Sequence, residues 1–199
     1  EKGNASYDIT YPSAWDKIRL SMEDTELVKN ADFFVFGSLA SRDESTKKTL
    51  SQLLDVANYK IFDVNLRVPH YTEEALKELM AVADFIKFND DELFEISKYL
   101  GSNHKSLEQN IKYISKETNT AAICVTLGSH GAVLYCKGTF YNNCGFKVDV
   151  LDTVGSGDSF LASLVTKLFS DVNPQEALNF ACAVGAIVAQ NEGANPIIT

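Results

Sequence analysis

The sequence predicts an α/β protein whose strands form a mainly parallel sheet. Short apolar segments rich in β-branched and aromatic residues alternate with longer segments of helical periodicity. Such alternation is typical of parallel strands that are covered by helices. With 199 residues, of which 45% are hydrophobic, the chain is long enough to bury a substantial core in one domain.

The predicted elements follow one another in a regular order. Apolar strands are expected at residues 33–37, 60–64, 85–88 and 121–127. Helices are expected after the first three strands at residues 42–56, 73–83 and 90–100, and a further helix at residues 105–117 leads into the fourth strand. These repeated strand–helix units favour parallel pairing of the strands.

The last third of the chain contains a hairpin and two further helices. Residues 131–136 and 139–142 are the expected hairpin strands, because Lys137-Gly138 suits a two-residue turn. Residues 146–151 are rich in β-forming side chains and are expected to be a strand before the helix that contains residues 160–168. The final helix is expected from Asn173-Pro174 to about residue 190, since proline suits the first helical position.

Composition excludes several classes of function. The net charge of −9 argues against general binding to nucleic acid or to anionic membranes. No apolar run approaches the length of a membrane span. The four cysteines contain no C-x-x-C pair, so reduced thiols in a cytoplasmic protein are expected rather than disulfides or zinc ligands. The three histidines are scattered, and none is assigned to a metal.

The most informative segment is the run 152–160, which reads DTVGSGDSF. Its two glycines lie where a predicted strand turns into a helix, and Asp158 follows in the first helical turn. Unpaired N–H groups and the helix dipole make such a turn a good site for phosphates. A carboxylate beside it suits the base that activates a hydroxyl for phosphoryl transfer. The alternative is that Asp158 only complements the helix dipole and the glycines only form the turn.

This run resembles the C-terminal signature of the ribokinase-like (pfkB) sugar kinases. The resemblance implies that Asp158 is the catalytic base and that the backbone of Gly155, Ser156 and Gly157 forms an anion hole. It also implies a three-layer ribokinase-like fold that uses ATP and Mg²⁺. In some relatives a monovalent cation such as K⁺ binds beside the anion hole, and the matching positions here are Asp152 and the backbone of Val154 and Gly193.

A second matching segment is DVNLR at residues 63–67, at the carboxyl end of a predicted strand. Open α/β sheets bind ligands at that end of their strands. In the family, the corresponding Asn and Arg approach the phosphate-transfer region, so the resemblance places Asn65 there and lets Arg67 neutralise the γ-phosphate. From the residues alone, the favoured explanation is that Asn65 caps a turn and that Arg67 is a solvated surface charge.

Two further segments match in family order. Asn89 and Glu92 have the spacing of a helix cap, and the family carries Asn-x-x-Glu there, with the Glu helping to organise Mg²⁺, often through water. Thr126, Gly128 and Gly131 end the most apolar strand, and the corresponding family residues line the nucleotide. Taken alone, the first pair is sufficiently explained as a cap, and the second set as a turn.

The beginning of the chain resembles the fructokinase-like branch of the family after its first third. The similarity is carried by Tyr7-Asp8-Ile9 and Ala14-Trp15-Asp16. We therefore expect a ribokinase-like fold that lacks the N-terminal third, with residues 1–12 as a remnant of a β lid and residues 13–199 as the α/β nucleotide-binding and catalytic core. Relatives often dimerise through their lids, so the resemblance allows a homodimer, which one lid strand does not establish. The similarity at Ala14-Trp15-Asp16 and at Gly37-Ser38-Leu39-Ala40 favours fructose as the sugar.

The leading hypothesis is an ATP-dependent sugar kinase, inactive as this fragment alone. The alternative is a non-catalytic sugar- or nucleotide-binding protein, or a truncated remnant, on the same fold. The sequence contains neither G-x-x-x-x-G-K-[ST] nor the protein-kinase motifs, which excludes a P-loop or protein kinase. It also lacks G-x-G-x-x-G after an early strand, which excludes a dinucleotide oxidoreductase.

Overall fold

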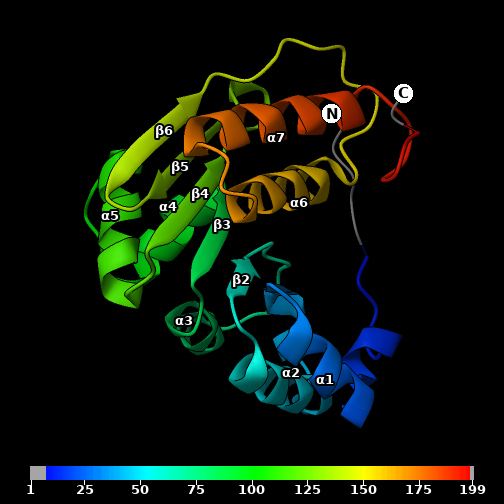
Figure 1. Cartoon of the computed structure of the whole chain (residues 1–199). Helices are drawn as coiled ribbons and strands as arrows, with labels where there is room; N and C mark the ends of the chain where they lie inside the picture. The colour runs from blue at the N-terminus through cyan, green and yellow to red at the C-terminus, as the bar shows by residue number, and fades with distance from the viewer. Residues whose placement is uncertain (1–7, 198–199) are drawn as a thin grey trace. The chain divides into compact units, whose positions relative to one another are not determined.

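The computed structural model describes residues 8–197 (Figure 1). Its strands are β1 (Phe34–Gly37), β2 (Lys60–Asp63), β3 (Phe85–Asn89), β4 (Ala122–Thr126), β5 (Ala132–Cys136) and β6 (Thr139–Asn143). Its α-helices are α1 (Met22–Asn30), α2 (Glu44–Val56), α3 (Glu73–Ala81), α4 (Asp90–Tyr99), α5 (Leu107–Thr118), α6 (Ser156–Phe169) and α7 (Pro174–Ala189). Short 3₁₀ turns are η1 (Ala14–Lys17), η2 (Ser38–Ser41) and η3 (Gly128–His130).

The strands form a sheet in the order β1-β2-β3-β4-β5-β6. β1 pairs with β2 and β2 with β3 in parallel, whereas β5 and β6 form an antiparallel hairpin. Lys137 and Gly138 both have positive φ in the hairpin turn, as a two-residue turn of the expected type requires. The predicted α/β fold with a mainly parallel sheet is confirmed.

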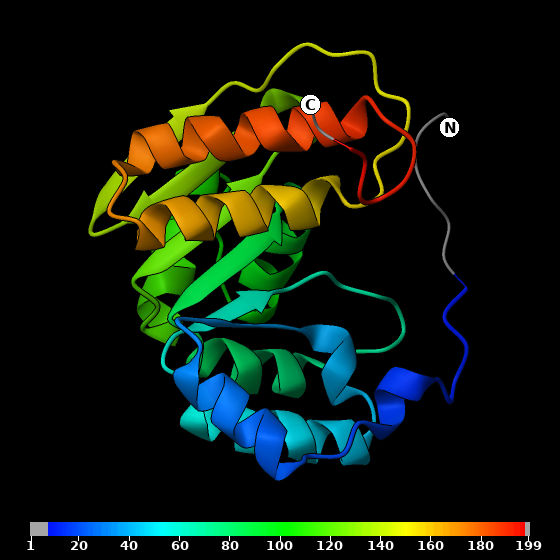
Figure 2. The ribbon, with the colours of Figure 1, turned by 45° about the vertical axis from the view of Figure 1, so that its right-hand side comes forward.

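The described residues divide into two compact units, and the boundary falls within β4. Residues 9–124 form what we call the N-terminal unit, and residues 125–197 together with Asp8 form the C-terminal unit. In the C-terminal unit α6 and α7 run side by side, and α7 packs on β5 and β6 (Figure 2). The predicted division into a lid remnant, 1–12, and a core, 13–199, stays a prediction.

Each unit has its own apolar core. Fully buried side chains come from β2 and β3 and from α4 and α5 in the N-terminal unit, and they include Ile61, Phe62, Ile86, Phe88, Leu93, Ile96, Ile111 and Ile114. In the C-terminal unit they come from β5, α6 and α7 and include Leu134, Leu164, Ala177, Leu178 and Ala181. Burial of these residues fixes the strand ends and helix starts that carry the site residues.

The expected strand at residues 146–151 is wrong. The chain has no regular structure between β6 and α6 before residue 151, and the connection is visible as the long yellow loop in Figure 2. Phe146, Val150 and Leu151 are 45%, 53% and 59% exposed. The backbone N–H of Leu151 donates to Ala189 O at 2.8 Å, so the segment is held by the end of α7 rather than by a strand.

Two other differences concern the beginning of the chain. Residues 8–10, the described part of the expected lid strand, are not in a strand, and Ser6 and Tyr7 lie outside the described residues. Helix α1 was not predicted, because none of its residues is buried and its apolar pattern is therefore weak. The sequence signal for this helix was its N-terminal cap. Ser21 and Asp24 each accept, through the side chain, a hydrogen bond from the backbone N–H of the other.

Candidate functional site

The N-terminal end of α6 is built around Gly155. Gly155 is the residue before the helix, with a φ of +77° in the left-handed region, and the helix start has no side-chain cap. A Cβ at this position would lie 2.5 Å from Ala194 O and 2.6 Å from Ala194 Cα. Only glycine combines this conformation with this close approach, so the turn and the segment around residue 194 fit together.

Asp152 fastens the same two segments. Its Oδ1 accepts from the Val154 N–H at 3.0 Å and its Oδ2 from the Gly193 N–H at 3.0 Å. The hydrogen bond from Val154, followed by that from Gly193, lowers the pKa of Asp152 below its usual value. The three residues that we predicted around a monovalent cation therefore lie together, with a carboxylate at their centre.

The first turn of α6 leaves backbone donors open. Within residues 8–197, the structure gives no hydrogen-bond partner for the amide N–H groups of Gly157 and Asp158. The Ser156 N–H reaches Thr153 O at 3.3 Å, and the Ser156 hydroxyl donates to Gly185 O at 2.9 Å, which ties α6 to α7. The Asp158 side chain is exposed. Two open amides and a carboxylate thus lie at the positive end of a helix dipole.

The turn after β4 belongs to the same unit. Gly128 and Gly131 have φ of +56° and +84°, and Thr126 ends β4. A Cβ on Gly131 would lie 2.0 Å from Asn143 O, whereas one on Gly128 would meet nothing within 4 Å. Gly131 is therefore required by the neighbouring end of β6, and Gly128 leaves an open backbone surface.

Asn65 and Arg67 lie in the N-terminal unit, on the loop after β2. Asn65 is exposed and has a φ of +41°, which asparagine tolerates better than most residues. Arg67 is partly buried, and its Nη1 donates to Leu66 O at 3.1 Å. The His70 N–H donates to Arg67 O at 2.7 Å and closes a turn.

Asn89 and Glu92 form a complete capping box at the start of α4. The Glu92 N–H donates to Asn89 Oδ1 and the Asn89 N–H donates to Glu92 Oε2, both at 2.8 Å. Glu92 Oε1 accepts from the Leu66 N–H, also at 2.8 Å. Glu92 is 6% exposed, and this burial raises the pKa of its carboxyl above the usual value, although both backbone hydrogen bonds oppose the rise.

The structure thus brings the predicted residues together in two groups. Leu66 connects the loop that carries Asn65 and Arg67 to Glu92 in the N-terminal unit. The turn 152–158, Gly193 and the turn after β4 belong to the C-terminal unit. Sequence reasoning missed the buried ion pair between Lys87 Nζ in β3 and Asp63 Oδ1 at the end of β2, at 3.0 Å. A lysine in an apolar strand, one strand away from an aspartate, was the available signal.

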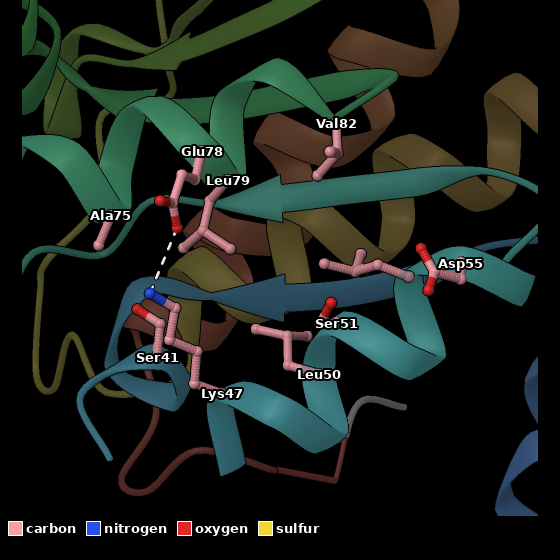
Figure 3. Close-up of a pocket in the computed structure, with 10 residues that line it drawn as sticks. Ser41, Lys47, Leu50, Ser51, Asp55, Ala75, Glu78, Leu79 and Val82 are labelled. Carbon is pink, nitrogen blue, oxygen red and sulfur yellow. Dashed lines mark ion pairs between the residues drawn. The ribbon is translucent and has the colours of Figure 1, made fainter. Parts of the chain in front are cut away.

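Among the cavities formed by residues 8–197, two lie in the N-terminal unit, and no predicted site residue lines either of these two. The first, of about 170 Å³, lies between α2 and α3, and Figure 3 shows Lys47 and Glu78 facing each other across it. Their ion pair joins Lys47 Nζ and Glu78 Oε2 at 3.3 Å. The second, of about 360 Å³, is lined by residues that include Tyr11, Arg42, His70 and Tyr71. Within residues 8–197, no group of three or more His, Cys, Asp or Glu side chains is placed to hold a metal ion, and no helix is both long and apolar enough to cross a membrane.

Comparison with known proteins decides the family. Residues 7–199 match the pfkB family carbohydrate kinases. The chain belongs to this family. It is 31% identical over 189 residues to fructokinase-2 of Solanum lycopersicum, a match that covers 87% of the chain and 56% of that protein. It is 32% identical over 203 residues to a probable fructokinase-2 of Arabidopsis thaliana, covering 94% and 60%. The pfkB chain thus spans little more than half the length of these relatives.

Solved structures share the fold. Fructokinase from Vibrio cholerae O395, in a form with fructose, ADP and calcium ion bound, has a TM-score of 0.70 at 22% identity, covering 81% of this chain and 56% of that one. Aminoimidazole riboside kinase from Salmonella enterica, complexed with aminoimidazole riboside and an ATP analog, has a TM-score of 0.66 at 26% identity, covering 81% and 57%. A putative ribokinase II from E. coli has a TM-score of 0.75 at 19% identity, covering 85% and 55%. The predicted ribokinase-like fold is confirmed.

Proposed function

We propose that the protein to which this chain belongs phosphorylates a sugar hydroxyl with ATP, and that fructose is the preferred sugar. Membership of the carbohydrate kinases and the similarity to fructokinases support the reaction class and the sugar. One structural observation carries the proposal. The start of α6 presents an exposed carboxylate and two amide N–H groups that have no hydrogen-bond partner among residues 8–197, all within a single helical turn.

In the proposed reaction Asp158 accepts the proton of the sugar hydroxyl as that oxygen attacks the γ-phosphorus of ATP. The bond to the bridging oxygen breaks, and ADP leaves. The N–H groups of Gly157 and Asp158 donate to the transferring group, where negative charge is spread over its oxygens. Because these donors are fixed by the helix, they need no reorganisation during the reaction.

The remaining predicted residues would hold the nucleotide. Thr126 and the open backbone at Gly128 suit contact with its phosphates, while Gly131 shapes the turn. Arg67 supplies a planar cationic donor for the γ-phosphate, with Asn65 beside it on the same loop. These assignments rest on the family resemblance and on the backbone conformations at Asn65, Gly128 and Gly131.

Mg²⁺, when bound, neutralises phosphate charge. Direct coordination by Glu92 does not fit, because its carboxylate is nearly buried and both of its oxygens accept backbone N–H groups. A contact through water remains our proposal. Both oxygens of Asp152 also accept backbone N–H groups, from Val154 and Gly193, so our proposal of a K⁺ site at Asp152, Val154 and Gly193 rests on the family resemblance. The homodimer through the lid and the cytoplasmic location stay predictions.

The test is formation of ADP by the full-length gene product with a panel of sugars. We expect turnover with fructose, and the change Asp158→Asn should lower turnover by about 10² to 10⁴-fold, because it removes the base, while nucleotide affinity stays nearly unchanged. Asp171→Asn is the matched control, because Asp171 is exposed just beyond the other end of α6 and asparagine tolerates its φ of +55°.

Unchanged turnover in Asp158→Asn would refute the assigned base. Binding of sugar and nucleotide without formation of ADP would favour a non-catalytic binding protein instead. The 199-residue chain assayed beside the full-length protein should show no turnover, because the resemblance places most sugar contacts outside it.

A further inference from the structure

The loop between β2 and α3 carries Asn65 and Arg67, and its tip is exposed. Val68 is 78% exposed, and Asn65 and Pro69 are exposed as well. Loops of this kind move unless they are tied to the fold. A side chain that has to meet a phosphate in one geometry gains from such a tie, because misplacement by about 1 Å costs up to 10²-fold in rate.

Both ends of this loop are tied to α4. At its start, the Leu66 N–H donates to Glu92 Oε1 at 2.8 Å. At its end, the Tyr71 hydroxyl donates to Glu95 Oε1 at 2.7 Å. Glu92 and Glu95 are three positions apart and therefore lie on the same side of the helix. One side of α4 thus holds the segment from Leu66 to Tyr71 by a hydrogen bond at each end.

The second tie has a distinctive construction. Glu95 Oε1 also accepts from the Tyr99 hydroxyl, at 2.6 Å, so one carboxylate oxygen holds two phenols. These hydrogen bonds, that from Tyr99 first, lower the pKa of Glu95 below its usual value. The carboxylate is therefore ionised at neutral pH, and both contacts are charge-assisted, which makes them stronger than bonds between neutral groups. Tyr99 belongs to α4 itself, whereas Tyr71 belongs to the loop.

We propose that Glu95, acting through the Tyr71 hydroxyl, is a positioning residue that holds Arg67 in register with the transferring phosphate. The proposal rests on the proposed function, since it assumes that Arg67 meets the γ-phosphate. Glu95 touches neither substrate nor nucleotide in this scheme. It fixes the far end of the loop, while Glu92 fixes the near end.

The test compares two variants of the full-length kinase that each remove one hydroxyl from the same carboxylate oxygen. Tyr71→Phe frees the loop, and we expect kcat to fall about tenfold and KM for ATP to rise, with KM for the sugar unchanged. Tyr99→Phe also removes one donor to Glu95 but leaves the loop tied, so kcat should stay within twofold of the unmodified enzyme. Amide hydrogen exchange at residues 65–70 should become faster in Tyr71→Phe alone.

A background of Arg67→Ala shows whether Tyr71 acts through Arg67. In that background Tyr71→Phe should have no further effect on kcat, whereas a general loss of stability would lower kcat in both backgrounds. Wild-type kcat in Tyr71→Phe, or an equal loss in the two backgrounds, would overturn the proposal while Arg67 keeps its role. If Arg67→Ala itself leaves turnover unchanged, the role of Arg67 under the proposed function is wrong, and the positioning proposal falls with it.

Discussion

Helices α4 and α6 both have an acidic residue at the third position, Glu92 and Asp158, and use it in opposite ways. In α4, Glu92 is buried, and its side chain accepts a hydrogen bond from the backbone N–H of Asn89, the residue before the helix. The Asn89 side chain in turn accepts one from the Glu92 N–H. In α6, Asp158 is exposed, and the residue before the helix is Gly155, which has no side chain to donate or accept.

The difference teaches how backbone donors decide between a structural and a binding role. Every helix start has N–H groups without a partner inside the helix. The cap of α4 satisfies the N–H of its third residue, Glu92, and Glu92 fixes a neighbouring loop as well. The glycine turn of α6 leaves the amides of Gly157 and Asp158 without a partner among residues 8–197, and we propose that they bind a phosphate. An acid in the first turn is therefore informative only together with the residue before the helix.

The largest effect is expected from a side chain at the turn that opens α6. Gly155→Ala places a Cβ 2.5 Å from Ala194 O at a φ of +77°. Overpacking against backbone and the left-handed conformation together should lower the free energy of unfolding by about 3 kcal/mol. Denaturant unfolding of the full-length protein measures this change. Gly128→Ala is the matched control, because its φ is also positive but its Cβ would meet nothing within 4 Å.

In the control Gly128→Ala, the free energy of unfolding should fall by only about 1 kcal/mol, because only the left-handed conformation is unfavourable there. Equal losses in the two variants would mean that the contact with Ala194 does not require glycine. The turn of α6 would then differ from the cap of α4 only in conformation, and the comparison of the two helix starts would lose its packing argument.

A smaller effect should separate the two acids directly. Glu92→Gln places an amide NH₂ against one of the two backbone N–H groups that Glu92 accepts. We therefore expect the free energy of unfolding to fall by about 2 kcal/mol at pH 7. Asp158→Asn breaks no hydrogen bond found in residues 8–197, so its unfolding free energy should change by less than about 0.5 kcal/mol. The same denaturation experiment measures both variants. A loss of stability in Asp158→Asn as large as that in Glu92→Gln would show a structural role for Asp158.

Most of the fold was predictable from the sequence, and the failures have physical causes. The strands and helices of the cores were predictable because burial imposes periodicity, as at Ile61-Phe62 and Ile86. Helix α1 buries no residue and so gives little periodic signal. Residues 146–151 have β propensity, but the end of α7 holds the segment away from any strand, and propensity does not report such tertiary contacts.

The candidate site divides in the same way. The glycine turn before Asp158 was predictable because its conformation demands glycine at Gly155, which the sequence displays directly. The cap at Asn89 and Glu92 was predictable from local spacing. The contact of Leu66 with Glu92 and that of Tyr71 with Glu95 were not, because each joins residues more than 20 positions apart through tertiary packing. No local pattern records such a contact.

The smallest effect concerns two carboxylates that each accept two backbone N–H groups, Asp152 at the turn of α6 and Glu92 at the cap of α4. The pKa of Asp152 is lowered. Its contribution to stability is therefore present above its ordinary pKa of 3.8 and is lost as the pH falls through the lower pKa of the folded state.

The pKa of Glu92 is raised from 4.5 by burial. The folded state therefore holds this proton more tightly than the unfolded state, and stability decreases as the pH rises from 4.5 through the pKa of the folded state. The stability advantage of the unmodified protein over Asp152→Asn should therefore narrow below pH 4, and that over Glu92→Gln should narrow above pH 4.5. Unfolding measured from pH 3 to 7 compares the two slopes, and slopes of the same sign would mean that burial does not separate these two carboxylates.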